Sequence, residues 1–210
     1  MIIYHDLKVI SIRVPGTGST PFHQQMNKKY QRQQSIHVAK DHSARSLNNI
    51  HMYEHFTAEQ AQLCIDSQIW KTYEKISFVR HPFWWARSIY RKLDCWNMLG
   101  IDIEGSFEQY LERLDKTPYF WFTDASGCAM IDTIYRTEDL RKVYEKYDLV
   151  YRHSNRSPTK REYEITAGVK TLLHEKFARE YEHYDKNDTL GQEWDHLNSI
   201  PSTAKGNVND

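Results

Sequence analysis

The chain of 210 residues lacks the features that mark secreted and membrane-spanning proteins. No stretch approaches the roughly 20 apolar residues of a spanning helix, and the first residues lack the apolar core of a secretory signal. Cysteine is scarce, and an odd number at wide spacing predicts neither a disulfide framework nor a CxxC metal site. The three cysteines are Cys64, Cys95 and Cys128. We therefore expect a cytoplasmic protein with no metal site and no membrane partner.

The chain also lacks net charge, because 28 basic side chains balance 28 acidic ones. This balance is uneven along the sequence. Residues 1–50 hold seven basic and two acidic side chains, and residues 71–92 hold six and one, so each segment carries +5. Residues 101–150 offset them with six basic and eleven acidic side chains. Local positive potential of this kind favours a small polyanion as the partner and disfavours nucleic acid.

Aromatic residues are abundant, and they exclude a chain that is disordered throughout. The 6 Trp, 14 Tyr and 8 Phe supply enough surface for burial in a core. The length suits one core of ordinary size, so we expect a single domain over residues 1–185. From about residue 186 the composition turns to Asn, Asp, Ser, Thr, Gly and Pro, which predicts a flexible tail over 186–210.

A strand, a loop and a helix recur along the chain, which favours a parallel sheet flanked by helices. Strands are expected over residues 7–14, 74–80 and 129–135. Helices are expected from Pro21, capped by Ser19 or Thr20, and over 57–70, 83–98, 106–116, 138–147 and 160–184.

The first loop of this pattern has the composition of an anion site. Small residues between a strand and a helix let backbone N–H groups converge at the positive end of the helix. The loop comprises Pro15, Gly16, Thr17, Gly18, Ser19 and Thr20. It is not a Walker A motif, because no Lys precedes the final hydroxyl residue, and this disfavours ATP or GTP hydrolysis. The alternative is an ordinary turn followed by a capped helix.

A second candidate site follows the second expected strand. Arg80 comes at the carboxyl end of that strand, and Ser88 follows eight residues later on the next helix. Ligands of open α/β sheets bind at this end of the strands, and a guanidinium with a hydroxyl can hold a phosphate monoester. The alternatives are a surface ion pair for Arg80 and a solvated hydroxyl for Ser88.

Together these segments resemble the sulfotransferases that depend on 3′-phosphoadenosine-5′-phosphosulfate (PAPS), in particular the carbohydrate sulfotransferase-like proteins of the bacterial and viral branch. Residues 14–20 are similar to the family's 5′-phosphosulfate loop, usually written PKTGST. Residues 78–83, with Arg80 and Ser88 at the family's spacing, are similar to its 3′-phosphate motif. Residues 41–45, Asp-His-Ser-Ala-Arg, are similar to a segment between the two.

The resemblance implies a three-layer α/β fold, with a central parallel sheet flanked by helices, of the P-loop-like sulfotransferase type. It implies transfer of a sulfuryl group from PAPS to a hydroxyl of a small molecule or glycan, with PAP (3′,5′-diphosphoadenosine) as product and no metal. Residues 15–20 would bind the 5′-phosphosulfate, and Arg80 and Ser88 the 3′-phosphate. His42 would be the general base, because imidazole titrates near neutral pH.

One departure from the family bears on catalysis. The family carries Lys after the loop Pro, whereas this chain has Gly16. We expect Lys40, Arg45 or Arg13 to supply the missing charge. Two alternative functions remain: a catalytically impaired module that binds PAP or PAPS, and a P-loop-like phosphoryl transferase.

The acceptor site has one aromatic candidate. Trp84, Trp85, Phe120, Trp121 and Phe122 could form a platform for a sugar or an aromatic alcohol. The alternative is that these side chains belong to a packed core.

Overall fold

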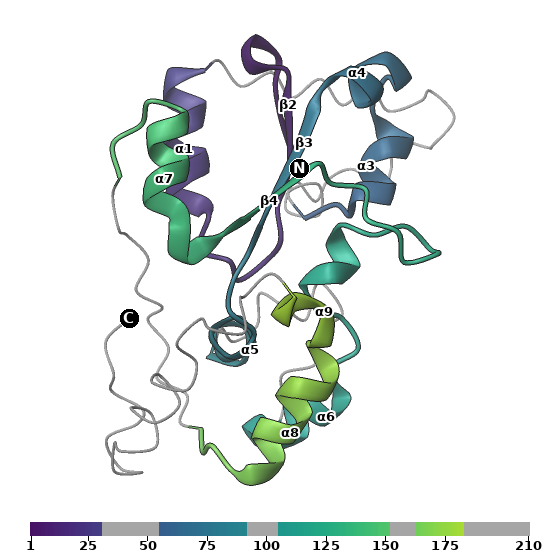
Figure 1. Cartoon of the computed structure of the whole chain (residues 1–210), viewed down its shortest axis with the longest axis vertical. Coiled ribbons are helices and arrows are strands. Elements are labelled where there is room, and N and C mark those ends of the chain that lie inside the picture. The colour runs from purple at the N-terminus through teal and green to yellow at the C-terminus, as the bar shows by residue number, and fades with distance from the viewer. Residues whose placement is uncertain (31–54, 92–104, 152–162, 183–210) are drawn as a thin grey trace. The chain divides into compact units, whose positions relative to one another are not determined.

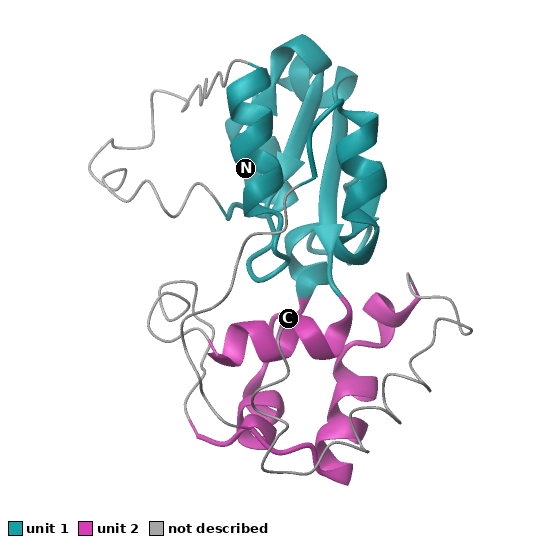
Figure 2. Cartoon of the chain, turned by 90° about the vertical axis from the view of Figure 1, so that its left-hand side faces the viewer, with its two compact units in different colours: residues 1–80, 118–154 teal, residues 81–117, 155–210 magenta. Residues whose placement is uncertain are grey.

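The computed structural model describes residues 1–30, 55–91, 105–151 and 163–182. The chain forms two compact units, each assembled from two separate stretches of sequence (Figure 2). Unit 1 comprises residues 1–80 and 118–154, and unit 2 comprises residues 81–117 and 155–210. The single domain expected over 1–185 stays a prediction, and the expected tail over 186–210 lies outside the described residues.

Unit 1 contains a four-stranded mixed sheet in the order β1-β2-β3-β4. The strands are β1 (Ile2–Tyr4), β2 (Val9–Ile12), β3 (Glu74–Val79) and β4 (Thr133–Arg136). β2, β3 and β4 run parallel, with Ile12 opposite Ser77 and Val79 opposite Arg136. The expected α/β class is confirmed, and the carboxyl ends of the three parallel strands meet at one edge of the sheet.

β1 is an antiparallel strand that the sequence pattern did not reveal. A short 3₁₀ helix, η1 (His5–Leu7), reverses the chain between β1 and β2. Lys8 completes the reversal in the left-handed region with a φ of 51°. This short reversal places β1 antiparallel to β2. The sheet is therefore mixed, with β2, β3 and β4 parallel and β1 antiparallel.

Helices lie on both sides of the sheet in unit 1. α1 (Thr20–Lys29) and α7 (Leu140–Lys146) lie on one side, and α3 (Ala58–Cys64) and α4 (Ser67–Thr72) lie on the other (Figure 1). The helix expected over 57–70 is divided into α3 and α4. Asp66 causes the break, because its side chain accepts the backbone N–H groups of Gln68 and Ile69 and so caps a new helix.

The main hydrophobic core of unit 1 lies between the sheet, α1 and α7. Phe22 of α1 is fully buried in it, with its ring 5.1 Å from that of Phe78 on β3 and 5.6 Å from that of Tyr144 on α7. Val9 and Ile76 join the same cluster, so this face of β2 and β3 is directed toward α1. The core thus holds the start of α1 against the sheet.

Unit 2 is helical in its described part. Its helices are α5 (Pro82–Arg91), α6 (Phe107–Arg113), α8 (Ala167–Lys176) and α9 (Ala178–Tyr181). Ser106 and Gln109 form a capping box that starts α6, at the beginning of the helix expected over 106–116. Thr166 donates its hydroxyl to Glu108 at 2.8 Å and joins the start of α8 to α6. The long helix expected over 160–184 is interrupted at Phe177.

Among the described residues, no helix combines the length and the apolar character needed to cross a membrane. Besides η1, the described part of unit 1 contains the short 3₁₀ helices η4 (Pro118–Trp121) and η5 (Thr137–Asp139), which precede an isolated bridge and α7 respectively. η5 is the element that connects β4 to α7, and its first residue takes part in the site described below.

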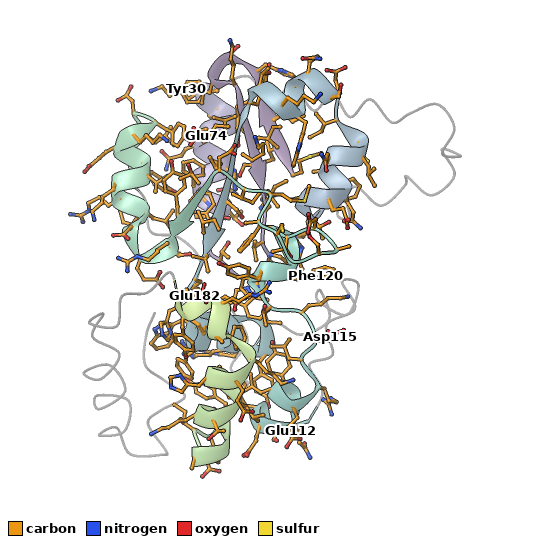
Figure 3. The ribbon with its side chains drawn as sticks, turned by 45° about the vertical axis from the view of Figure 1, so that its right-hand side comes forward. Tyr30, Glu74, Glu112, Asp115, Phe120 and Glu182 are labelled. Atoms are coloured by element: carbon orange, nitrogen blue, oxygen red, sulfur yellow. The ribbon has the colours of Figure 1, made fainter. Side chains whose placement is uncertain are left out.

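Replacing Phe22 with Ala should lower the free energy of unfolding by about 3–5 kcal/mol, because a buried ring is lost from a packed core. Phe120→Ala is the matched control, since Phe120 is 44% exposed (Figure 3) and should cost about 1 kcal/mol or less. Urea denaturation measures both. Similar losses for the two variants would contradict the assignment of Phe22 to the core.

Candidate functional site

The loop of residues 15–20 follows β2 and has the backbone of an anion-binding nest. Gly16 and Gly18 lie in the left-handed region, with φ values of 76° and 72°. Ser19, which comes next, is right-handed with φ −74° and ψ −2°. Neighbouring residues of opposite hand turn successive N–H groups toward one point, where an anion can bind. Glycine suits both left-handed positions because it has no β-carbon.

Ser19 is the N-cap of α1, which is one of the two residues expected there, but its side chain makes no capping hydrogen bond. The Ser19 hydroxyl lies 3.3 Å from the Thr17 hydroxyl. Thr17 donates its own hydroxyl to the carbonyl of Val14 at 3.0 Å. These two buried hydroxyls therefore brace the loop from inside, and the N–H groups at the start of α1 are left to another acceptor.

Thr137 connects this loop to the end of β3. Its hydroxyl lies 2.8 Å from the carbonyl oxygen of Thr17 and 2.9 Å from that of Val79, and the two carbonyls share its single proton. Val79 is the last residue of β3, so Arg80 follows directly. The structure thus brings the loop next to the chain position of Arg80.

Arginines follow or end all three parallel strands at this edge. Arg13 comes directly after β2, Arg80 comes directly after β3, and Arg136 is the last residue of β4. Arg13 is only 9% exposed, and its Nη2 donates to the Thr20 hydroxyl at 3.4 Å. Arg136 donates to the Asp139 carboxylate at 2.7 Å and so lowers the pKa of that carboxyl. The edge is rich in positive charge, which favours an anion there.

A buried histidine lies near Arg13. His23 is on α1, one turn after the loop, and its Nδ1 lies 3.2 Å from the Tyr4 hydroxyl. Burial lowers the pKa of His23 well below its ordinary value, and the charges of Arg13, the amino terminus and His55 lower it further. Its Nε2 is buried, and no described residue forms a hydrogen bond with it. The ring is therefore neutral at pH 7 and adds no charge to the site.

The sequence reasoning overlooked His23 and Thr137. Its own choice among the 11 histidines, His42, lies outside the described residues, and so do Lys40 and Arg45. Two signals were available. His23 follows the loop within one helical turn, and Thr137 comes directly after a strand whose parallel neighbours end at the candidate site.

Ser88 is on α5 of unit 2, where it is half-buried. Its expected partnership with Arg80, which belongs to unit 1, stays a prediction.

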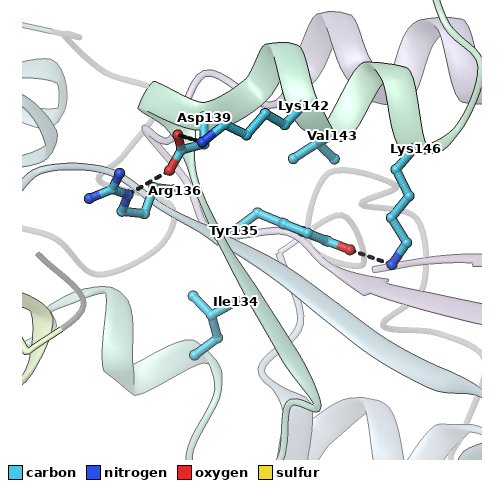
Figure 4. A pocket seen from close by; sticks show the side chains of 7 residues that line it. All are labelled: Ile134, Tyr135, Arg136, Asp139, Lys142, Val143 and Lys146. Atoms are coloured by element: carbon cyan, nitrogen blue, oxygen red, sulfur yellow. Dashed lines mark hydrogen bonds and ion pairs between the residues drawn. The ribbon is translucent and has the colours of Figure 1, made fainter.

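A separate cavity of about 460 Å³ lies between β4 and α7 (Figure 4). Three cations and one carboxylate line it together with Ile134, Tyr135 and Val143. Lys142 pairs with Asp139 at 3.2 Å, and Lys146 donates to the Tyr135 hydroxyl at 2.6 Å. Its polar groups thus already have partners within the chain.

The aromatic side chains considered for an acceptor platform mostly belong to packed regions. Trp85, Trp121 and Phe122 are buried, which confirms the core interpretation for these three. Trp84 is half-buried, and its ring lies 5.0 Å from the Arg87 guanidinium in unit 2. Phe120 is the exposed member of the set.

Comparison of the chain with protein-family models, with curated proteins and with solved structures finds no match in any of the three.

Thr137→Val should lower the free energy of unfolding by about 1–3 kcal/mol, because the carbonyls of Thr17 and Val79 lose their shared donor. Thr72→Val is the matched control. Thr72 donates its hydroxyl to the Gln68 carbonyl at an exposed helix end, where water can replace it. Urea denaturation of both variants tests the bridge, and equal small losses would contradict it.

The buried His23 should make stability fall with acidity. The pKa of His23 is lower in the folded chain than in the unfolded chain. Below about pH 6.5 the unfolded chain therefore binds a proton at this histidine and the folded chain does not. The free energy of unfolding then decreases by up to about 1.4 kcal/mol per pH unit. Unfolding of the wild type and of His23→Gln between pH 7.5 and 5 isolates this contribution. The variant should show the shallower slope, whereas exposed His174→Gln should follow the wild type. A wild-type slope in His23→Gln would refute the assignment.

Proposed function

We propose that this chain is a PAPS-dependent sulfotransferase with the three-layer, P-loop-like sulfotransferase fold. The observation that carries the proposal is the Thr137 bridge. It joins a loop with the backbone of an anion-binding nest to the end of β3, directly before Arg80. PAPS carries two anionic groups, the 5′-phosphosulfate and the 3′-phosphate, so a protein that binds it needs one anion site for each. The resemblance of residues 14–20 and 78–83 to the family's two phosphate motifs adds independent support.

In this proposal the backbone N–H groups of residues 15–20 bind the 5′-phosphosulfate at the start of α1. Arg80 binds the 3′-phosphate through charge-assisted hydrogen bonds. The two hydroxyls of Thr17 and Ser19 are buried and bonded within the loop. Their role is therefore to hold the loop in shape, and the direct contacts to the ligand come from the backbone.

The reaction is an in-line displacement at sulfur. An acceptor hydroxyl of a small molecule or glycan forms the new S–O bond, while the bond from sulfur to the bridging oxygen of the phosphosulfate breaks and PAP leaves. The acceptor's proton passes to a general base, for which His42 is the candidate. The protein's part is to hold the two reactants in line and to stabilise the charge that develops on the departing phosphate.

A second function, a binding module for PAP or PAPS without turnover, is favoured by one observation. Gly16 replaces the family's Lys and has a φ of 76°, a conformation that a lysine would adopt only with strain. The backbone conformation of the loop at position 16 therefore suits glycine better than lysine. A phosphoryl transferase is the third candidate, and the absence of a Walker lysine counts against it.

The test of donor binding compares PAP, 5′-AMP and ATP by titration calorimetry. PAP should bind at least about tenfold more tightly than 5′-AMP, because only PAP carries the 3′-phosphate. Arg80→Gln should reduce this preference by about 10- to 100-fold. Arg141→Gln is the matched control, since Arg141 is exposed on α7 with its guanidinium 5.8 Å from the Tyr151 ring. No preference for PAP in the wild type, or a preference unchanged in Arg80→Gln, would refute the proposed site.

The test of turnover uses PAPS labelled in its sulfuryl group and a mixed panel of glycans and small alcohols. Transfer of label to an acceptor supports the enzyme. Tight binding of PAP with no transfer to any acceptor or to water indicates the binding module, and tighter binding of ATP than of PAP indicates the phosphoryl transferase.

A further inference from the structure

We propose that Arg13 supplies the positive charge at the 5′ end of the donor site, in place of the lysine that the loop lacks. This inference rests on the proposed function, because it assigns a residue to the 5′-phosphosulfate. The sequence left three candidates for this charge. Arg13 is the candidate that lies within the described residues, directly after β2 and two residues before the loop of residues 15–20.

Arg13 lies on the side of the sheet that faces α1. Side chains alternate along a strand, so Val9 and Ser11 of β2 are directed to the same face of the sheet. Val9 belongs to the core that the sheet shares with α1 and α7. Arg13 comes directly after β2, and its contact with the Thr20 hydroxyl places its guanidinium on the side of α1.

The guanidinium of Arg13 lies at the start of α1. Nη2 of Arg13 lies 3.4 Å from the hydroxyl of Thr20, the first residue of α1. The guanidinium thus contacts the side chain of the first residue of the helix. A helix N-terminus and a guanidinium both attract anions, and the fork of the guanidinium matches the oxygens of a phosphate or sulfate.

The charged side chain of Arg13 is largely shielded from solvent. Arg13 is 9% exposed, so water screens it less than it would a surface arginine. Its charge also reaches the interior, because it contributes to the lowered pKa of His23. A neutral His23 in turn adds no repulsion to the guanidinium. A cation in such a position interacts more strongly with a bound anion than an exposed one does.

The geometry also accounts for the absence of the lysine. Gly16 and Gly18 both have left-handed φ values, and only glycine adopts these without strain. A cation at this loop must therefore come from a residue outside the two glycine positions. Arg13 is three residues before Gly16.

The test separates the two ends of the donor. PAP and adenosine 3′-monophosphate differ only in the 5′-phosphate, so the ratio of their affinities reports the 5′ site alone. Arg13→Gln should weaken PAP binding by about 10- to 100-fold and leave binding of the 3′-monophosphate within about threefold. Lys8→Gln is the matched control, because it removes one charge directly before β2, whereas Arg13 comes directly after it. It should change neither affinity.

Equal losses of both ligands in Arg13→Gln, or no loss of PAP affinity, would overturn the role of Arg13 while leaving the proposed function intact. Absence of any preference for PAP over 5′-AMP in the wild type would instead overturn the proposed function. Circular dichroism establishes that each variant is folded. Should Arg13→Gln not fold, Arg13→Met takes its place, because an unbranched apolar side chain fills the same buried space without a charge. The same change in the affinity ratio is expected for it.

Discussion

The parallel pairing of β2 with β3 is the constraint on which the candidate site depends. Because the two strands run in the same direction in one sheet, the segments that leave them emerge at the same edge. One of these segments is the loop of residues 15–20, and the other begins at Arg80. The Thr137 hydroxyl then joins them by sharing its proton between a carbonyl on each side. Without this pairing, two motifs more than 60 residues apart in the sequence would have no reason to meet.

The electrostatics of this edge result from placement more than from the number of charges. The chain as a whole is neutral, yet each of the three parallel strands ends at or next to an arginine. Arg136 is paired with Asp139, whereas the guanidinium of Arg13 lies against the start of α1. The buried His23 beside it is neutral, because burial and nearby positive charge both disfavour its protonated form. The positive potential at the loop therefore comes from arginine and from the helix itself.

Much of the local structure could be predicted from the sequence because local chemistry determines it. β3 was expected over residues 74–80 and is observed over Glu74–Val79. The capping boxes at Thr57 and Ser106 start their helices as expected, since both partners of each box lie within one turn. Breaks such as those at Asp66 and Phe177 were missed. Apolar spacing continues through a break, whereas the competing cap depends on the side-chain conformation of one residue.

The sequence alone was sufficient to indicate an α/β chain, the small-residue loop between β2 and α1, and an arginine at the end of β3. These features depend on neighbours in the chain, such as alternating apolar residues, glycines at left-handed positions and residues that start or end a helix. The tertiary structure decided that β1 adds to the sheet, that Thr137 joins the loop to β3, and that the guanidinium of Arg13 contacts the start of α1. Each of these depends on strand register and on which face of the sheet a side chain occupies, and register is set by the packing of segments far apart in the sequence.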